Sequence, residues 1–192
     1  MNILIAVASR HGSTRGIADV IAQELTASGY TATVRDAGEV TDLEQYDAAI
    51  VGSAIYMGNW LPEARRFVQH NRDRLSALPV WLFSSGPLGE DEPQPRDDPG
   101  HLTDLMRACG AREHRTFLGK LASNDLGFGE RLAVKVVRAP EGDFRDWPAI
   151  REWAQSKGLP ADPMDAFRQS GYLERITAER GAKNMAAVSS YA

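Results

Sequence analysis

The amino-terminal stretch, residues 2–25, constrains the fold of this chain most. An apolar run at residues 3–8 (ILIAVA) gives way to a polar segment at residues 9–14 (SRHGST), and apolar residues then recur at helical spacing up to Leu25. A strand that is apolar on both faces suits the centre of a parallel sheet covered by helices. The stretch therefore predicts a β-strand, a tight polar loop and an α-helix.

The polar segment at residues 9–14 predicts a phosphate-binding loop. The N-terminus of a helix offers unpaired backbone N–H groups and the positive end of a dipole, to which the hydroxyls of Ser9, Ser13 and Thr14 add donors. Gly12 lets the backbone approach an anion closely. The alternative is an ordinary turn with helix caps. Because the sequence lacks the G-x-x-x-x-G-K-[ST] and G-x-G-x-x-G patterns, a mononucleotide monophosphate is favoured.

The rest of the chain alternates strand-like and helix-like segments. Apolar or β-prone runs are found at residues 31–34, 48–53, 79–84 and 114–119, and helical segments are expected at residues 62–75, at residues 102–109 and, with Asp146 as N-cap, up to residue 157. This order predicts an α/β fold, a doubly wound five-stranded parallel sheet with helices on both faces. The loops that follow its central strands lie along the carboxyl edge, where ligands bind.

Two further loops at this edge favour a planar, phosphorylated ligand, and FMN fits the pattern. Its phosphate is expected on residues 9–14, and its ring system between residues 53–60 and residues 84–89. Tyr56 or Trp60 can stack on the isoalloxazine, while the alternative for both is hydrophobic packing. The candidate cofactor-binding residues are Ser9, Arg10, His11, Gly12, Ser13, Thr14, Ser53, Ala54, Ile55, Tyr56, Met57, Gly58, Trp60, Ser84, Ser85, Gly86, Leu88 and Gly89.

Composition narrows the classes of protein. A net charge of −4, from 22 basic and 26 acidic side chains, provides no global field that would recruit nucleic acid. The single cysteine, Cys109, excludes an internal disulfide and is expected to be a small buried residue, and the four scattered histidines show no metal-ligand spacing. Without a leader-like start or a long apolar run, the chain is expected to be cytoplasmic.

Two segments are expected to lie outside the sheet and its helices. Residues 90–98 carry five acids against one base, so they predict a surface loop or, alternatively, a lid or partner-facing loop beside the ligand. Residues 159–192 are expected to form a C-terminal helical extension and tail, with Asp162 as an N-cap. Residues 1–158 then make up the FMN-binding domain.

An insertion at residues 120–144 interrupts the last α/β unit. Read as a helix, residues 126–138 place Arg131, Lys135 and Arg138 in one stripe with apolar side chains over the rest. The stripe predicts the solvated edge of a core-facing helix, and the alternative is contact with a membrane surface.

The motifs quoted above resemble those of a known family. Residues 9–14 resemble the flavodoxin phosphate loop, and residues 46–58 (YDAAIVGSAIYMG) resemble the corresponding segment of a flavodoxin domain. Among flavodoxin-like families the resemblance is closest to the menaquinone-dependent protoporphyrinogen oxidase family. It rests on the opening SRHGSTRGIA, the loop from Gly52 to Gly58, the GKL at residues 119–121 and the Asp-Trp at residues 146–147.

The resemblance implies an FMN-dependent oxidoreductase that transfers reducing equivalents from an organic substrate, such as protoporphyrinogen IX in heme biosynthesis, to a quinone. The alternatives are a flavodoxin-type electron carrier that docks with a redox protein partner, and a flavin-free protein that binds a partner through its C-terminal helix. No loop side chain is an obvious acid or base, so no catalytic residue is named, and the oligomeric state, a homodimer included, stays open. His11 replaces the usual hydroxyl of electron-carrier flavodoxins, and the acidic residues 90–98 would repel the carboxylates of a tetrapyrrole.

Overall fold

The computed structural model describes residues 1–56, 58–86, 101–121 and 142–157. These all belong to one compact unit, Met1–Gly158, and the second unit, Leu159–Ala192, lies outside the described residues. Also outside them are the acidic residues 90–98, the helices expected at residues 126–138 and in the C-terminal extension, and the candidate site residues Met57, Leu88 and Gly89.

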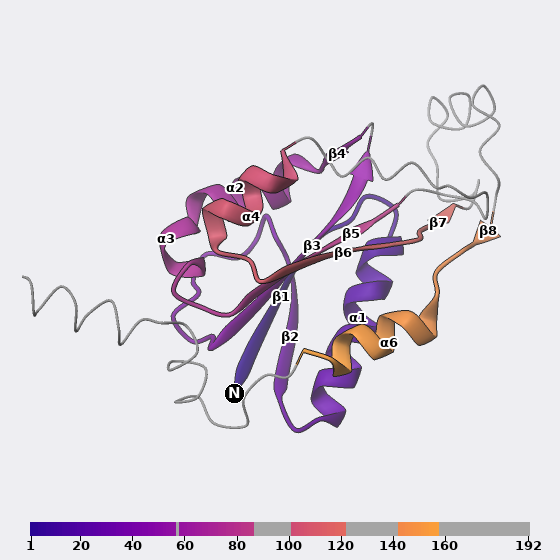
Figure 1. The fold of residues 1–192 in the computed structure, drawn as a ribbon, viewed down its shortest axis with the longest axis horizontal. Helices are drawn as coiled ribbons and strands as arrows, with labels where there is room; N and C mark the ends of the chain where they lie inside the picture. Colours follow the sequence, from indigo (N-terminus) through magenta and orange to yellow (C-terminus); the bar gives the residue numbers. More distant parts are fainter. Residues whose placement is uncertain (57, 87–100, 122–141, 158–192) are drawn as a thin grey trace, which may run out of the picture. The chain divides into compact units, whose positions relative to one another are not determined.

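Five parallel strands form the main sheet, in the order β2-β1-β3-β5-β6 (Figure 1). They are β1 (Asn2–Ala8), β2 (Thr31–Asp36), β3 (Ala48–Tyr56), β5 (Val80–Ser85) and β6 (Glu113–Phe117). This confirms the doubly wound five-stranded parallel sheet. The strand order reverses between β1 and β3, so their carboxyl ends flank the crevice in which such sheets bind ligands.

Two short strand pairs lie outside the parallel ladder. Strand β4 (Asn59–Trp60) returns antiparallel along the end of β3, with Ile55 opposite Trp60 and Tyr56 opposite Asn59. Strands β7 (Lys120–Leu121) and β8 (Gly142–Asp143) pair antiparallel in a sheet of their own. We call residues 119–121 and 142–145 the ribbon base, because they flank the segment 122–141 in the sequence.

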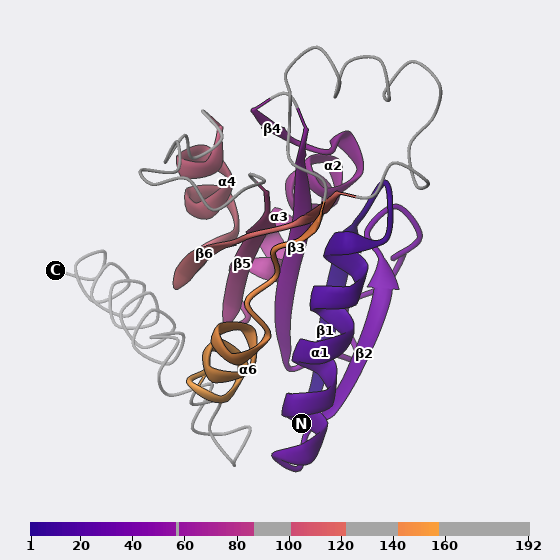
Figure 2. The ribbon, with the colours of Figure 1, turned by 90° about the vertical axis from the view of Figure 1, so that its right-hand side faces the viewer.

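Helices cover both faces of the sheet, as expected. Helices α1 and α6 lie on one face and α2, α3 and α4 on the other (Figures 1 and 2). Their bounds are α1 (Ser13–Ala27), α2 (Pro62–His70), α3 (Arg72–Leu75), α4 (Leu102–Cys109) and α6 (Trp147–Gln155). None of the helices in the described part of the chain is both long enough and apolar enough to cross a bilayer.

The prediction of a single helix at residues 62–75 is wrong, because the structure has two helices there, α2 and α3. The break falls at Asn71, whose backbone has φ −105° and ψ 14°. Its side-chain amide donates a hydrogen bond of 2.9 Å to the carbonyl of Phe67. Asparagine offers the backbone such a local alternative to the helical hydrogen bond and therefore favours helix ends.

The core explains why β1 is apolar throughout. Residues 3–6 are completely buried because helices cover both of their faces. On the α1 and α6 face, Phe83, Phe117 and Trp153 pack with ring centroids 5.6 to 6.2 Å apart. Gly52 lies directly opposite Phe83, and a Cβ at this position would come within 2.1 Å of the phenyl ring. The ring therefore occupies the space that a side chain at residue 52 would need.

The single cysteine is a small buried core residue, as expected. Cys109 is completely buried at the end of α4, and its thiol donates to the carbonyl of Leu105 at 3.1 Å. Burial raises the pKa of the thiol to about 11, so the reactive thiolate is scarce at neutral pH.

Candidate functional site

The first loop carries β1 into α1 at the switch point of the sheet. Gly12 stands at the N-cap position with φ +77°, a left-handed conformation that glycine adopts without strain. It has no side chain to cap the helix, and the space where its Cβ would lie is open to 4 Å. The first turn of α1 contains no acidic residue. Its N–H groups and positive dipole end are therefore suited to an anion from outside the loop.

The hydroxyl of Ser9 points to the same conclusion. Its oxygen is buried, and it has no hydrogen-bond partner among the described residues. Leaving a buried polar group unpaired costs about 1–3 kcal/mol, so native structures rarely keep one without a reason. A phosphate group held at the start of α1 is a partner that this hydroxyl fits. Ser9 and the first turn of α1 thus fit the phosphate of FMN.

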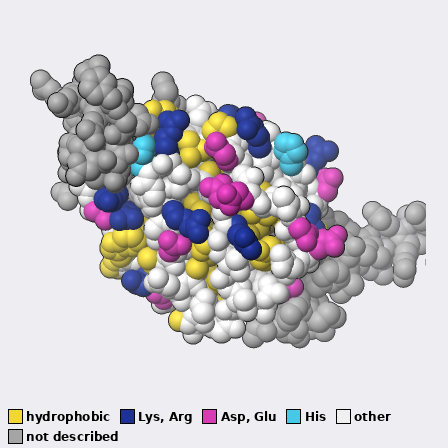
Figure 3. Space-filling model, turned by 180° about the vertical axis from the view of Figure 1, so that it is seen from behind, with side chains coloured by type: hydrophobic (Ala, Val, Ile, Leu, Met, Phe, Trp, Pro, Cys, Tyr) yellow, Lys and Arg dark blue, Asp and Glu magenta, His cyan; other side chains and the backbone are white. Residues whose placement is uncertain are grey.

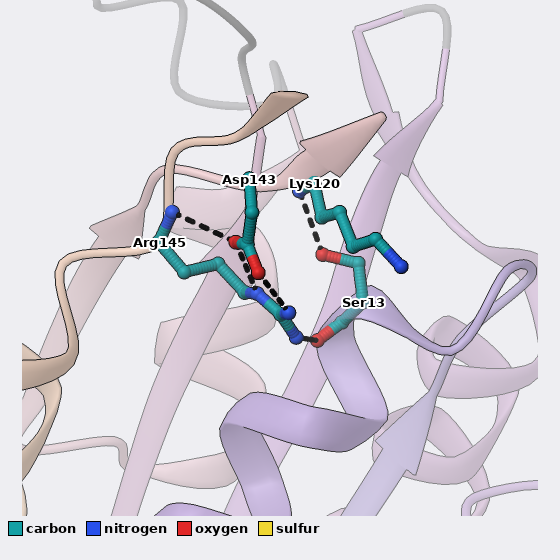
Figure 4. Close-up of polar contacts among 4 residues, drawn as sticks. All are labelled: Ser13, Lys120, Asp143 and Arg145. Carbon is teal, nitrogen blue, oxygen red and sulfur yellow. Dashed lines mark hydrogen bonds and ion pairs between the residues drawn. The ribbon is translucent and has the colours of Figure 1, made fainter. Parts of the chain in front are cut away.

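Ser13 is held by residues from the far end of the domain (Figure 4). Its hydroxyl oxygen accepts a hydrogen bond of 2.9 Å from the backbone N–H of Lys120. Its carbonyl accepts one of 3.4 Å from Nη1 of Arg145. Arg145 in turn pairs with the carboxylate of Asp143, its Nε lying 2.7 Å from Oδ1. These hydrogen bonds hold the pKa of Asp143 below its usual value.

Sequence reasoning did not single out Lys120, Asp143 or Arg145 as site residues. Lys120 and Arg145 lie 107 and 132 residues beyond their partner Ser13, so no local pattern connects them with the loop. Two signals pointed to Lys120: the GKL at residues 119–121 in the family resemblance, and the position of this segment directly after β6, whose carboxyl end lies at the ligand-binding edge.

The second expected loop is the β3–β4 hairpin, and it separates the two candidate aromatic residues. Trp60 is 1% exposed, and its indole N–H donates to Oγ of Ser84 at 2.8 Å. The Trp60 ring is therefore packed in the interior of the protein. Tyr56 is 41% exposed, and Cζ of Arg10 lies 4.3 Å from its ring centroid. Of the two rings, that of Tyr56 is therefore the exposed one.

The serines at the ends of β3 and β5 are also engaged inside the protein. Ser53 accepts a hydrogen bond of 2.9 Å from the backbone N–H of Leu61 and donates one to the carbonyl of Ala54. Oγ of Ser84 lies 2.8 Å from Nε2 of His114. Their side chains therefore help to hold the hairpin in place.

Two histidines that sequence reasoning missed support the hairpin. His114 contacts Ser84, and His101 accepts a 3.3 Å hydrogen bond from the backbone N–H of Trp60. Burial lowers the pKa of His101, and the nearby Arg65 lowers it further, so the neutral ring that accepts this bond is favoured.

The structure brings the three expected loops together at one edge. Arg10 joins the first loop to the hairpin at Tyr56. The hairpin contacts the loop after β5 at Gly86, which has φ +127° and lies close to Ile55. A Cβ at residue 86 would lie 3.5 Å from the Cβ of Ile55. Beside the first loop is a cavity of about 270 Å³, lined by Ala8, Ser9, Arg10, Asp36, Leu61, Pro62 and Glu63.

Comparison with known proteins agrees with this arrangement. The chain is 31% identical over 86 residues to protoporphyrinogen IX dehydrogenase [quinone] of Escherichia coli strain K12, a match that covers 44% of this chain and 48% of that protein. The same protein from E. coli O157:H7 matches equally well. The chain thus spans about half the length of the curated relatives it matches.

Solved structures share the fold over most of the chain. Oxidised flavodoxin 1 from Bacillus cereus superposes with a TM-score of 0.55 at 18% identity, over 83% of this chain and 100% of that one. The flavodoxin of Streptococcus pneumonia gives a TM-score of 0.53 at 18% identity, with the same coverage. At this identity the likeness establishes the fold. The Flavodoxin domain family itself matches residues 4–147. The chain therefore belongs to the flavodoxin domain family, a family of FMN-binding domains.

Proposed function

We propose that this protein is an FMN-dependent oxidoreductase whose residues 9–14 bind the phosphate of the cofactor. The observation that carries this proposal is the buried hydroxyl of Ser9, which has no partner among the described residues and lies in the loop that opens α1. A dianionic phosphate would accept from this hydroxyl and from the first-turn N–H groups, and such charge-assisted hydrogen bonds are the stronger kind.

The ring system of FMN is proposed to lie against the β3–β4 hairpin and the loop that follows β5. Tyr56 offers the exposed aromatic face, while Ser53, Ser84 and Trp60 keep the hairpin in place from below. Gly58 and Gly86 have no side chain of their own that would block a planar ring. Bound FMN supplies the redox chemistry, and the residues of this chain bind it, orient it and limit access of water.

We infer a quinone-linked reaction from the curated relative. Protoporphyrinogen IX dehydrogenase [quinone] matches 44% of this chain at 31% identity. This supports a reaction in which an organic substrate of the protoporphyrinogen type gives up reducing equivalents and a quinone accepts them, as in heme biosynthesis. The alternative is a flavodoxin-type electron carrier with a redox protein as partner.

Surface charge on the described residues bears on that alternative. Figure 3 shows basic and acidic side chains interspersed on one face of the molecule. A carrier that docks through charge benefits from a surface of one sign, which steers association. Interspersed charges favour an enzyme that meets small-molecule substrates.

Anaerobic turnover tests the proposed reaction. FMN-loaded protein is mixed with protoporphyrinogen IX and a menaquinone analogue, and porphyrin fluorescence is followed against a protein-free control. We expect faster porphyrin formation that requires both FMN and the quinone. Unchanged porphyrin formation with FMN bound and reducible would refute the reaction and leave the electron carrier.

We also propose a division of the chain into a flavin-binding domain and an extension. Residues 1–158 form the FMN-binding domain, and residues 159–192 are an extension that contributes nothing to flavin binding. Deleting residues 184–192 is therefore expected to leave the flavin content of the purified protein unchanged, as measured by absorbance. A large loss of flavin would contradict this division.

A further inference from the structure

The hydroxyl and the carbonyl of Ser13 are both contacted by the ribbon base (Figure 4). Lys120 donates from one strand of the ribbon to the Ser13 hydroxyl, and Arg145 donates from beyond the other strand to the Ser13 carbonyl. The two sides of the ribbon are joined by the pairing of Lys120 with Asp143 and by a 3.1 Å hydrogen bond from Phe144 N–H to the carbonyl of Gly119. The ribbon base therefore holds Ser13 as one unit.

The contact from Lys120 determines what the Ser13 hydroxyl can do. A backbone N–H can only donate, so Oγ of Ser13 acts as the acceptor in this bond. A serine hydroxyl has one proton, and accepting a hydrogen bond leaves that proton available to donate. The ribbon thus leaves Ser13 as a donor at the start of α1, where the phosphate is proposed to bind.

Arg145 has little freedom to lie elsewhere. Its side chain is 12% exposed, it makes a forked ion pair with Asp143, and its Cζ lies 4.3 Å from the ring centroid of Trp147. On the helix side, a Cβ at Gly16 would lie 2.7 Å from Nη1 of Arg145. The absence of a side chain at Gly16 makes room for the guanidinium against the first turn of α1.

A second arginine contact with α1, made from α6, provides a reference. Arg151 of α6 pairs with Glu24 near the other end of α1, with 2.6 Å between Nη1 and Oε1. Its side chain is 46% exposed, and exposed pairs contribute little to stability. Arg145 is more buried and contacts the phosphate loop itself, so the two ties should differ in what their loss affects.

We propose that Arg145 is a positioning residue for the phosphate loop: held by Asp143 and accommodated by Gly16, it fixes Ser13 in the orientation that presents its hydroxyl and the first turn of α1 to the phosphate of FMN. The inference rests on the proposed function, because it assigns Arg145 to that same site. It also links FMN to the ribbon base, since a phosphate that stabilises this orientation of Ser13 stabilises its contacts with Lys120 and Arg145.

Affinities for FMN and riboflavin test the proposal, because riboflavin lacks only the phosphate. Both dissociation constants are measured by quenching of flavin fluorescence for the wild type, Arg145→Ala, Gly16→Ala and the control Arg151→Ala. We expect Arg145→Ala to bind FMN about tenfold more weakly, as for loss of a charge-assisted interaction, and to bind riboflavin within about twofold of wild type. Arg151→Ala should leave both constants unchanged.

Gly16→Ala tests whether the position of the Arg145 side chain matters, separately from its charge and from the folding of the domain. Alanine is the better helix former, so α1 is preserved, and the guanidinium keeps its charge while it is displaced from Ser13. We expect a loss of FMN affinity in the same direction as for Arg145→Ala, again without a matching change for riboflavin. Hydrogen exchange of the Lys120 amide should slow more with FMN than with riboflavin at equal saturation.

The outcomes distinguish the two levels of the argument. If wild-type protein binds riboflavin as tightly as FMN, the phosphate loop of the proposed function fails and the inference fails with it. If wild-type protein prefers FMN, and Arg145→Ala keeps that preference or weakens both flavins equally, the inference alone is overturned. Thermal unfolding of each variant shows whether the domain is intact.

Discussion

Hydroxyl groups at one edge of this sheet fall into two classes. The hydroxyl of Ser9, one residue beyond the end of β1, is buried without a partner among the described residues. The hydroxyls of Ser53 and Ser84 are also buried, but each has two partners within the protein. The comparison shows that the same residue type at the same edge differs in hydrogen-bond satisfaction. From this difference we infer that Ser53 and Ser84 hold a loop in place and that Ser9 serves a ligand.

Position along the strand explains the difference. Ser53 and Ser84 lie within β3 and β5 as direct neighbours in the ladder, so their side chains point from the sheet toward the hairpin. There they meet the backbone of Leu61 and the indole of Trp60. Ser9 follows the end of its strand, so the sheet does not bring a neighbouring strand to its hydroxyl.

The largest expected effect is a loss of stability where β3 pairs with β5, next to Ser53 and Ser84. Gly52→Ala places a Cβ within 2.1 Å of the Phe83 ring, which Phe117 and Trp153 prevent from moving freely. We expect the free energy of unfolding to fall by about 3 kcal/mol, at the upper end of overpacking costs, measured by urea denaturation.

A second substitution serves as the control for this effect. Phe83→Leu in the Gly52→Ala background makes room for the added Cβ, so the double variant should lose less stability than the sum of the two single variants. Simple additivity would contradict the assigned contact.

Ser84→Ala tests the hydroxyls that have partners within the protein, and a smaller effect is expected. The substitution removes the acceptor of the buried Trp60 indole N–H and a partner of His114. An unsatisfied buried donor costs about 1–3 kcal/mol, so we expect the melting temperature of the flavin-free protein to fall by about 4–8 °C. Trp60→Phe in the Ser84→Ala background should recover part of the loss, and an unchanged melting temperature in the single variant would remove the distinction between the classes.

Ser9→Ala should give the opposite pattern. The variant removes a buried hydroxyl that has no partner in the described protein, so the flavin-free protein should keep or slightly raise its melting temperature. Its affinity for FMN should fall about tenfold, equivalent to about 1.4 kcal/mol, because one donor to the phosphate is lost. Calorimetric titration with FMN measures this, and equal affinity in both proteins would exclude Ser9 from the phosphate site.

The smallest expected effect concerns pH and the histidine under the hairpin. Burial and the nearby Arg65 lower the pKa of His101 from 6.5, while Asp104 opposes the shift, so the unfolded chain binds the proton more readily than the folded one. Stability is therefore complete above about pH 6.5 and declines as the pH falls through and below that value. His101→Gln keeps an acceptor for the backbone N–H of Trp60 and removes the group that takes up the proton, so it should flatten this decline. The melting temperature of both proteins is measured at several pH values between about 7.5 and 5. Parallel pH profiles would contradict a role for His101.

Much of the fold could be predicted because its signals are local. The apolar run of β1, the polar loop and the helical spacing of α1 lie within residues 2–25, and the structure has each of them there. The two-helix break at Asn71 was missed, because a single asparagine in an amphipathic segment weakly perturbs the pattern. The burial of Trp60 could not be predicted, because it depends on a hydrogen bond to Ser84, which is 24 residues away in the chain.

Local patterns in the sequence were enough to infer the α/β class, the strand and helix order, and the loop expected to meet the phosphate, since hydrophobic periodicity and helix-terminus chemistry depend on neighbouring residues. Only the tertiary structure decided which hydroxyls are satisfied and which residues support Ser13. Those contacts depend on pairing of strands and docking of α6, which bring Lys120 and Arg145 to a residue more than a hundred positions earlier. Long-range contacts of this kind leave no periodic trace in the sequence.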